Sequence, residues 1–159
     1  MRIIQSKKED AKKIAPIVSE ANKDVAELFN ITFENAPKHP SFYTPEWVLA
    51  DFKRGEQYFL FIEGGVAKGC VAFEKPDSET AYLNRLSVLP GFRHNGIGTE
   101  LVKFICNYSE AKKVKRVSIG IIAEHEVLKN WYLALGFIEG EMKKFEHLPF
   151  DVRFMRYEI

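Results

Sequence analysis

Residues 88–99 read VLPGFRHNGIGT, and this turn decides how the rest of the chain is interpreted. The turn follows a segment of strand character and opens a segment whose apolar residues recur at helical spacing. Gly96 and Gly98 have no side chains, so backbone N–H groups can approach a ligand closely. The start of a helix adds free donors and a partial positive charge, and Arg93 adds a cation suited to phosphate oxygens. The turn therefore predicts a site for a phosphate or pyrophosphate.

Three phosphate-binding motifs can be compared with this turn. A Walker loop requires Gly-Lys-Ser/Thr, whereas Ile97 follows Gly96 here. A dinucleotide fingerprint requires a third glycine where Leu101 stands. The acyl-coenzyme-A pattern Arg/Gln-x-x-Gly-x-Gly/Ala matches residues 93–98 at every fixed position. Two glycines alone could also form a simple tight strand-to-helix turn, and the surrounding sequence has to decide between these interpretations.

Before the turn, the pattern predicts helices followed by an antiparallel meander. Strands are expected at residues 2–5, 57–62, 66–74 and 81–89, with Gly64-Gly65 as a hairpin turn. One helix begins at Ser6 and contains Pro16, which predicts a kink or an early end, and a second piece covers residues 25–29. Residues 30–45 contain three prolines and are expected to be irregular, and a helix from Thr44-Pro45 to Gly55 follows.

After the turn, the pattern changes to alternating helices and strands. Helices are expected from Ile97 to Tyr108 and over residues 126–135, and Gly136 ends the second of these helices. Strands are expected at residues 114–122, from Phe137 onward, and at residues 151–157. The first crossover should be right-handed and join parallel strands. We therefore predict a single α/β (α+β) domain over residues 1–159, with one mixed, mostly antiparallel sheet and helices on both faces.

Composition narrows the class of function. The 159 residues carry a net charge of +1, so no general basic field favours nucleic acid. The two cysteines, Cys70 and Cys106, lack the spacing of a metal site and fit a reduced, cytoplasmic protein. No apolar run approaches a membrane span, and the charged start shows no secretory signal. We expect no nucleic-acid, membrane or metal partner.

Two segments together resemble the GNAT superfamily of N-acetyltransferases. They are residues 83–98, LNRLSVLPGFRHNGIG, and residues 130–137, NWYLALGF, which looks like the family's Tyr-x-x-x-Gly-Phe ending. The resemblance covers about residues 59–137 and implies the acyl-CoA N-acyltransferase fold, in which the sheet splays between the strands at residues 81–89 and 114–122. Acetyl-CoA would lie in that gap as the cosubstrate.

The resemblance also implies which residues hold acetyl-CoA. The pantetheine arm would pair with backbone groups of Leu86 and Val88 like an added strand. The pyrophosphate would bind to residues 93–98 and to the N–H of Thr99. The complete set of predicted cofactor-binding residues is Leu86, Ser87, Val88, Arg93, His94, Asn95, Gly96, Ile97, Gly98, Thr99, His125 and Asn130. His125 stands where many members have Asn, and Asn130 could equally be an exposed helical residue.

The resemblance makes Tyr132 the acid that protonates the leaving thiolate, since it precedes Gly136 by four residues as the family's acid does. The alternative is a core aromatic residue. Many members carry a Glu base where Asn84 stands, and Asn cannot take a proton. Glu124 is therefore the predicted base, with Glu74 behind it, while a water chain or an amine that binds in its neutral form would serve instead.

The predicted reaction is direct attack of a primary amine, from a small molecule or a peptide, on the thioester. The acceptor pocket is expected to contain the aromatic residues Phe33, His39, Phe42, Tyr43, His147 and Phe150. A non-catalytic acyl-CoA sensor and a nucleotide-binding module are the alternatives. Because members of this fold often form dimers, a homodimer is a further expectation.

Overall fold

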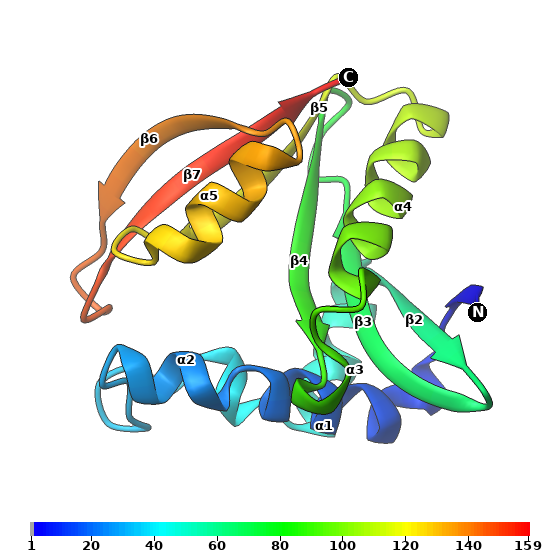
Figure 1. Ribbon diagram of the computed structural model, residues 1–159, viewed down its shortest axis with the longest axis horizontal. Helices are drawn as coiled ribbons and strands as arrows, with labels where there is room; N and C mark the ends of the chain where they lie inside the picture. Colours follow the sequence, from blue (N-terminus) through cyan, green and yellow to red (C-terminus); the bar gives the residue numbers. More distant parts are fainter. Residues whose placement is uncertain (1) are drawn as a thin grey trace.

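A computed structural model describes residues 2–159 as seven strands and five α-helices built around one sheet (Figure 1). The strands are β1 (Arg2–Gln5), β2 (Gln57–Glu63), β3 (Val66–Glu74), β4 (Thr80–Val88), β5 (Arg116–Ile122), β6 (Ile138–Lys144) and β7 (Asp151–Glu158). The α-helices are α1 (Ala11–Ala21), α2 (Lys23–Leu28), α3 (Pro45–Arg54), α4 (Ile97–Ala111) and α5 (Glu126–Ala134), and the short 3-10 turns are η1 (Lys8–Asp10), η2 (Pro40–Phe42) and η3 (Pro90–Phe92). The strand order in the sheet is β1-β2-β3-β4-β5-β7-β6.

The sheet splays in its middle. β4 and β5 are its one parallel pair among residues 2–159, and they are paired only from Thr80 to Tyr82 on β4. Beyond that point the two strands diverge, and Figure 1 shows the half that carries β6 and β7 standing apart from the half that carries β2 and β3. The predicted mixed, mostly antiparallel and splayed sheet is confirmed. The far part of β4 consequently has no strand neighbour on its β5 side.

Two hydrophobic layers cover the sheet, as the period-2 alternation of the strands requires. On one face, α4 and α5 pack over side chains that include Phe59, Val71 and Leu83. On the other face, α1 and α3 pack over Tyr58, Leu60 and neighbouring small residues. Helices on both faces are therefore confirmed, and α4, which follows the turn of residues 88–99 (the phosphate turn), packs against the sheet through its buried face.

The helix α1 departs from the sequence-based expectation at Pro16. It continues as one assigned helix through Pro16 to Ala21 rather than ending early. Ile14, Ile17 and Val18 on its inner face are buried against the sheet. This packing offsets the hydrogen bond that proline cannot donate.

None of the helices in residues 2–159 combines the length and apolar character needed to cross a bilayer.

Candidate functional site

The phosphate turn has the left-handed backbone that glycine allows. Gly96 has φ +81° and is the N-cap of α4, and a Cβ atom added there would meet nothing within 4 Å. Gly98 is instead closely packed, because a Cβ atom added there would lie 3.2 Å from Cζ2 of Trp131. Gly96 thus leaves open space in front of the helix, while Gly98 lets α5 pack closely against α4. The N–H groups at the start of α4 face a site with room for an anion.

The side chain of Arg93 is engaged by the protein itself. Its Nη1 lies 2.5 Å from Oδ2 of Asp24, its Nη2 donates to the carbonyl of Ala21 at 2.6 Å, and its Nε donates to the carbonyl of Val88 at 3.2 Å. In this arrangement the guanidinium ties β4 to the junction of α1 and α2. The backbone of the turn, rather than this guanidinium, is the part of the loop left free for phosphate oxygens.

A cavity of about 430 Å³ extends from the phosphate turn along β4. Most of the predicted cofactor-binding residues line it, namely Leu86, Ser87, Val88, Arg93, His94, Gly96, Ile97, Gly98, Thr99 and His125. Asn95 and Asn130 do not line it. Asn95 donates to the carbonyl of Phe92, and Asn130 is exposed on α5. The structure therefore brings ten of these twelve predicted residues together.

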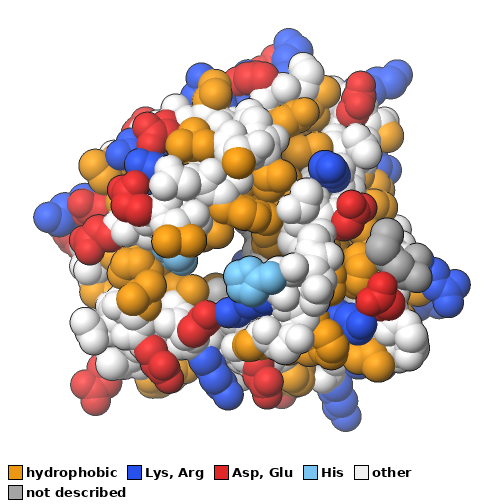
Figure 2. Space-filling view, viewed as in Figure 1, with side chains coloured by type: hydrophobic (Ala, Val, Ile, Leu, Met, Phe, Trp, Pro, Cys, Tyr) orange, Lys and Arg blue, Asp and Glu red, His pale blue; other side chains and the backbone are white. Residues whose placement is uncertain are grey.

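A second cavity of about 250 Å³ adjoins the first. Both are lined by Asn22, Val25, Leu86, His125 and Leu128, so they meet beside the splayed part of β4. Figure 2 shows an opening through the middle of the molecule, with apolar and histidine side chains at its edge. One ligand can thus enter along the phosphate turn and another from the second cavity, and their ends would meet between β4 and α5.

A bulge in β4 lies at this meeting point. Cys70 pairs with Ser87 and Ala72 pairs with Asn84, so the register shifts between these pairs, and Arg85 has φ +49°. The bulge comes directly before Leu86, which lines both cavities. A bulge beside an unpaired strand edge redirects backbone groups toward the open side.

Tyr132, the predicted acid, lies beside the second cavity. It is buried on α5, lines the second cavity, and packs against Trp131 and Phe137. Its hydroxyl forms no hydrogen bond with residues 2–159. Burial raises the pKa of Tyr132 above its usual value, so the phenol keeps its proton at neutral pH. The core-aromatic interpretation and the acid interpretation are compatible, because the ring packs while the residue reaches the cavity.

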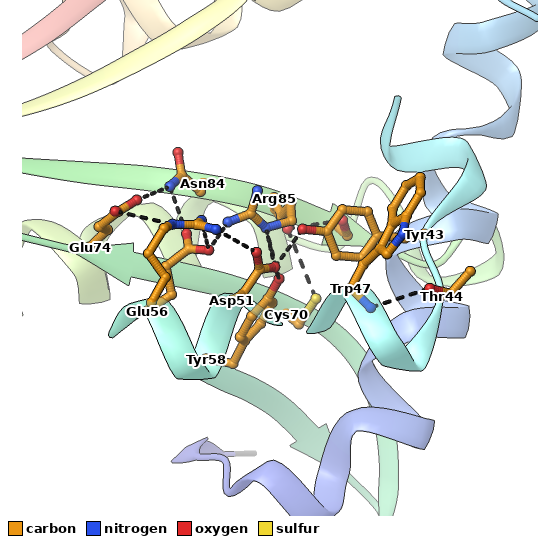
Figure 3. Close-up of polar contacts among 12 residues, drawn as sticks. Tyr43, Thr44, Trp47, Asp51, Glu56, Tyr58, Cys70, Glu74, Asn84 and Arg85 are labelled. Carbon is orange, nitrogen blue, oxygen red and sulfur yellow. Dashed lines mark hydrogen bonds and ion pairs between the residues drawn. The ribbon is translucent and has the colours of Figure 1, made fainter. Parts of the chain in front are cut away.

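Glu124, the predicted base, lies elsewhere. It is exposed in the turn after β5 and lines neither cavity. Glu74 and Asn84 instead join a network of polar side chains below β4 (Figure 3).

This network is the part of the site that the sequence did not reveal. Glu56 has a fully buried side chain that accepts hydrogen bonds from Asn84 (2.7 Å), Arg54 (2.6 Å) and Arg85. Burial raises the pKa of Glu56 to about 7, against the opposing effect of Arg85. The one sequence signal was a polar pair, Asn84-Arg85, inside a predicted strand, where charge is uncommon.

Asp51 extends the network toward two tyrosines. Tyr58 donates to its Oδ2 at 2.7 Å, Tyr43 donates to the same oxygen, and Nε of Arg85 lies 3.3 Å from it. The guanidinium of Arg85 also lies over the rings of Tyr43 and Tyr58, at 5.4 and 5.9 Å from their centroids. Arg85 is the member of this network that lines the second cavity.

Only part of the predicted aromatic pocket is present in the second cavity. His39 and Phe150 line it, whereas Phe33, Phe42, Tyr43 and His147 do not. Phe33 packs against Phe42 and is largely exposed, and Tyr43 belongs to the network around Arg85. The remaining lining is mostly aliphatic, and it contains no Asp or Glu from residues 2–159.

The splayed sheet and the cavity at the start of α4 define the acyl-CoA N-acyltransferase class, and comparison with known proteins agrees. The model of the acetyltransferase (GNAT) family matches residues 22–137, so the chain belongs to the GNAT family. An uncharacterized N-acetyltransferase of Schizosaccharomyces pombe is 34% identical over 61 residues, which are 38% of this chain and 42% of that relative. The family and the class of enzyme inferred from the two motifs are confirmed.

Solved structures show the same fold at low sequence identity. PaiA N-acetyltransferase from Thermoplasma acidophilum, in complex with coenzyme A, has a TM-score of 0.77 at 17% identity, with all of both chains covered. Ribosomal-protein-alanine N-acetyltransferase from Brucella melitensis has a TM-score of 0.73 at 18% identity, again over both whole chains. A GNAT acetyltransferase from Elizabethkingia anophelis with acetyl-CoA bound has a TM-score of 0.65 at 18% identity, covering 72% of this chain and 83% of that one.

Proposed function

We propose that this protein transfers the acetyl group of acetyl-CoA to a primary amine of a small molecule or peptide by direct attack. The observation that carries the proposal is the meeting of two cavities, one at the start of α4 and one beside Tyr132, at the bulge of β4. Two of the fold neighbours were solved with acetyl-CoA and with coenzyme A, which supports the same ligand here.

The residues at the start of α4 fit acetyl-CoA. The space in front of Gly96 and the free N–H groups of the turn suit the pyrophosphate. Leu86 and Val88 lie on the unpaired side of β4, where the pantetheine amides can complete the backbone hydrogen bonds. The acetyl group would then lie near Leu86, at the junction of the cavities. We propose a backbone N–H at or beside Leu86 as the oxyanion donor.

In the chemical step, the neutral amine attacks the thioester carbonyl carbon. The C–N bond forms, the C–S bond breaks, and Tyr132 donates its phenolic proton to the departing sulfur. The nitrogen releases one proton to solvent, and Tyr132 regains a proton from solvent, so the sum is amine plus acetyl-CoA giving amide plus coenzyme A. Because Glu124 lines neither cavity, the amine has to enter the step in its neutral form without help from that carboxylate.

The acceptor cavity suggests the kind of amine. Its lining is mostly aliphatic, and a second ammonium group would meet no carboxylate there. We therefore propose a monoamine with an apolar body rather than a polyamine.

The test begins with binding of acetyl-CoA by calorimetry, with ATP and NAD as controls. Release of free thiol is then followed with 2-phenylethylamine, trialanine and spermidine as acceptors. Binding of acetyl-CoA alone and turnover with either of the first two amines would support the proposal. Binding without turnover of any primary amine would favour an acyl-CoA sensor, and binding of ATP or NAD in place of acetyl-CoA would overturn the proposal.

A further inference from the structure

The ring of His39 is held by its own turn in one protonation pattern. The backbone N–H of Ser41 donates to Nδ1 of His39 at 3.2 Å, and Oγ of Ser41 lies 2.8 Å from the same nitrogen. A backbone N–H can only donate, so Nδ1 is an acceptor and carries no proton. Burial lowers the pKa of His39 below its usual value, which keeps the ring neutral at neutral pH. The one proton on the ring nitrogens is therefore on Nε2.

Nε2 of His39 forms no hydrogen bond with any residue in the described part of the chain, residues 2–159. The two nitrogens of an imidazole point in different directions, so Nε2 faces away from Ser41. His39 is half-buried and lines the second cavity, whose lining is mostly aliphatic. A hydrogen bond in such surroundings is stronger than one in water. The ring thus offers a neutral N–H donor for which a ligand oxygen is the matching partner.

Asn22 offers the complementary group. Its Nδ2 donates to the carbonyl of Val18 at 2.8 Å, and a carbonyl can only accept, so the orientation of the Asn22 amide is fixed. Oδ1 of Asn22 receives no hydrogen bond from the residues that the structure describes. Asn22 lines both cavities, so it lies where they meet. One donor and one acceptor beside the same cavity match the C=O and N–H of an amide group.

Charged substituents on the acceptor fit this cavity less well than a neutral amide. Arg85 lines the cavity, but its guanidinium is already paired with Asp51 and Glu56. A carboxylate on the acceptor would therefore meet no cation that lacks a partner, and a second ammonium group would meet no carboxylate from residues 2–159. Because burying a charge without a partner is costly, a neutral oxygen is the favoured substituent.

We propose that the acceptor has an amide group next to its primary amine, as an amino amide or the N-terminus of a peptide does, and that Nε2 of His39 donates to the amide oxygen. This inference rests on the proposed function and narrows its substrate class. The hydrogen bond holds the acceptor by its oxygen, so that its nitrogen is directed toward the thioester near Leu86. His39 moves no proton in the reaction, and it determines which amines are bound productively.

Two substitutions separate the roles of the two ring nitrogens. In His39→Asn, the side-chain oxygen takes the place of Nδ1 and can still accept from Ser41, while no donor remains at the place of Nε2. In His39→Gln, the longer side chain brings its NH₂ to the place of Nε2. His147→Asn is the matched control, because His147 is exposed and lies outside the cavity. Thermal unfolding of each variant shows whether the fold is kept.

Each protein is assayed with L-phenylalaninamide and with 2-phenylethylamine, which share a phenyl ring and differ in the amide group. The two amines differ in basicity, so each variant is compared with the wild type on the same amine. His39→Asn should lower kcat/KM for L-phenylalaninamide about 3- to 10-fold, the loss of one neutral hydrogen bond, and should change that for 2-phenylethylamine by less than about twofold. His39→Gln should recover part of this loss, and His147→Asn should match the wild type with both amines.

Equal losses with both amines in His39→Asn would overturn the inference, because a general disturbance of the cavity does not distinguish them. An unchanged kcat/KM for L-phenylalaninamide would overturn it as well, and so would a His39→Gln protein with the same loss as His39→Asn. A wild type that acetylates 2-phenylethylamine but not L-phenylalaninamide would leave the proposed function intact and reject this inference without any variant. A wild type that binds acetyl-CoA but acetylates neither amine would overturn the proposed function, and this inference with it.

Discussion

The two sides of the site are built in different ways. The side proposed for the cofactor is a continuous turn, residues 93–99, which offers backbone N–H groups and the space left by Gly96. The side proposed for the acceptor borders a network of side chains from α3, β2, β3 and β4, which reaches the second cavity through Arg85 and in which Glu56 and Arg85 are 29 positions apart. A backbone site leaves a local motif in the sequence, whereas a side-chain network leaves scattered polar residues. The predictions below test whether this division holds.

The largest effect is expected at Tyr132, where the two sides meet. Tyr132→Phe removes the proton donor and keeps the buried ring, so kcat should fall by about 10²- to 10⁴-fold. The affinity for acetyl-CoA should change little, since the hydroxyl acts in the transition state. Steady-state kinetics and calorimetry on the same preparation measure both quantities. An unchanged kcat would remove Tyr132 from the mechanism.

The second prediction concerns the free energy of unfolding and tests the acceptor-side network. Burial raises the pKa of Glu56 to about 7, well above the value near 4.5 of an exposed Glu. The folded state therefore binds this proton more tightly than the unfolded state does. Protonated Glu56 therefore adds roughly 3 kcal/mol to the free energy of unfolding below pH 4.5, at 1.36 kcal/mol per pKa unit. This stabilisation is lost as the pH rises to about 7.

Glu56→Gln is the matched variant for this measurement. It keeps an oxygen for Asn84 and the guanidinium groups but cannot ionise. The difference in stability between wild type and variant, from urea unfolding at pH 4.5 to 8, should change across this window and stay level above it. A difference that does not depend on pH would show that the pKa of Glu56 is the same in the folded and unfolded states, and that its neighbours fully offset the cost of burying its charge.

The contrast between the two sides also explains what the sequence could predict. The two motifs predicted the family and the splayed sheet, and ten of the twelve residues predicted to bind the cofactor line one cavity, because each of these features depends on a short segment with glycine, strand and helix signals. The base was assigned to Glu124 by its position after a strand, although that turn faces solvent. The partners of Asn84 could not be inferred, since only folding brings Glu56 and Glu74 beside it.

The third prediction tests the cofactor side through its backbone. Gly96→Val places a branched side chain in the open space before α4, at φ +81°. Acetyl-CoA affinity should fall about tenfold or more, and the left-handed backbone should reduce stability by about 1–2 kcal/mol. Gly91→Ala is the control, because a Cβ there meets nothing within 4 Å and its φ is not positive. Wild-type affinity in Gly96→Val would mean that the pyrophosphate binds elsewhere.

The smallest effect is expected for the ion pair between Arg93 and Asp24. Its members are partly exposed, with 30% and 57% of the side chains accessible, so removing Asp24 should cost about 0.2–1 kcal/mol of stability. Suppose that the guanidinium serves only to tie β4 to the start of α2. The loss of stability in the double variant should then be smaller than the sum of the losses in Asp24→Ala and Arg93→Ala, because both remove the same interaction. Both single variants should also retain acetyl-CoA affinity within about threefold. If Arg93 instead turns to the pyrophosphate when acetyl-CoA binds, Arg93→Ala should lose affinity while Asp24→Ala gains it, since the guanidinium is then released from its partner. That second outcome would make the cofactor side depend on a side chain as well as on the backbone, and the division between the two sides would no longer be complete.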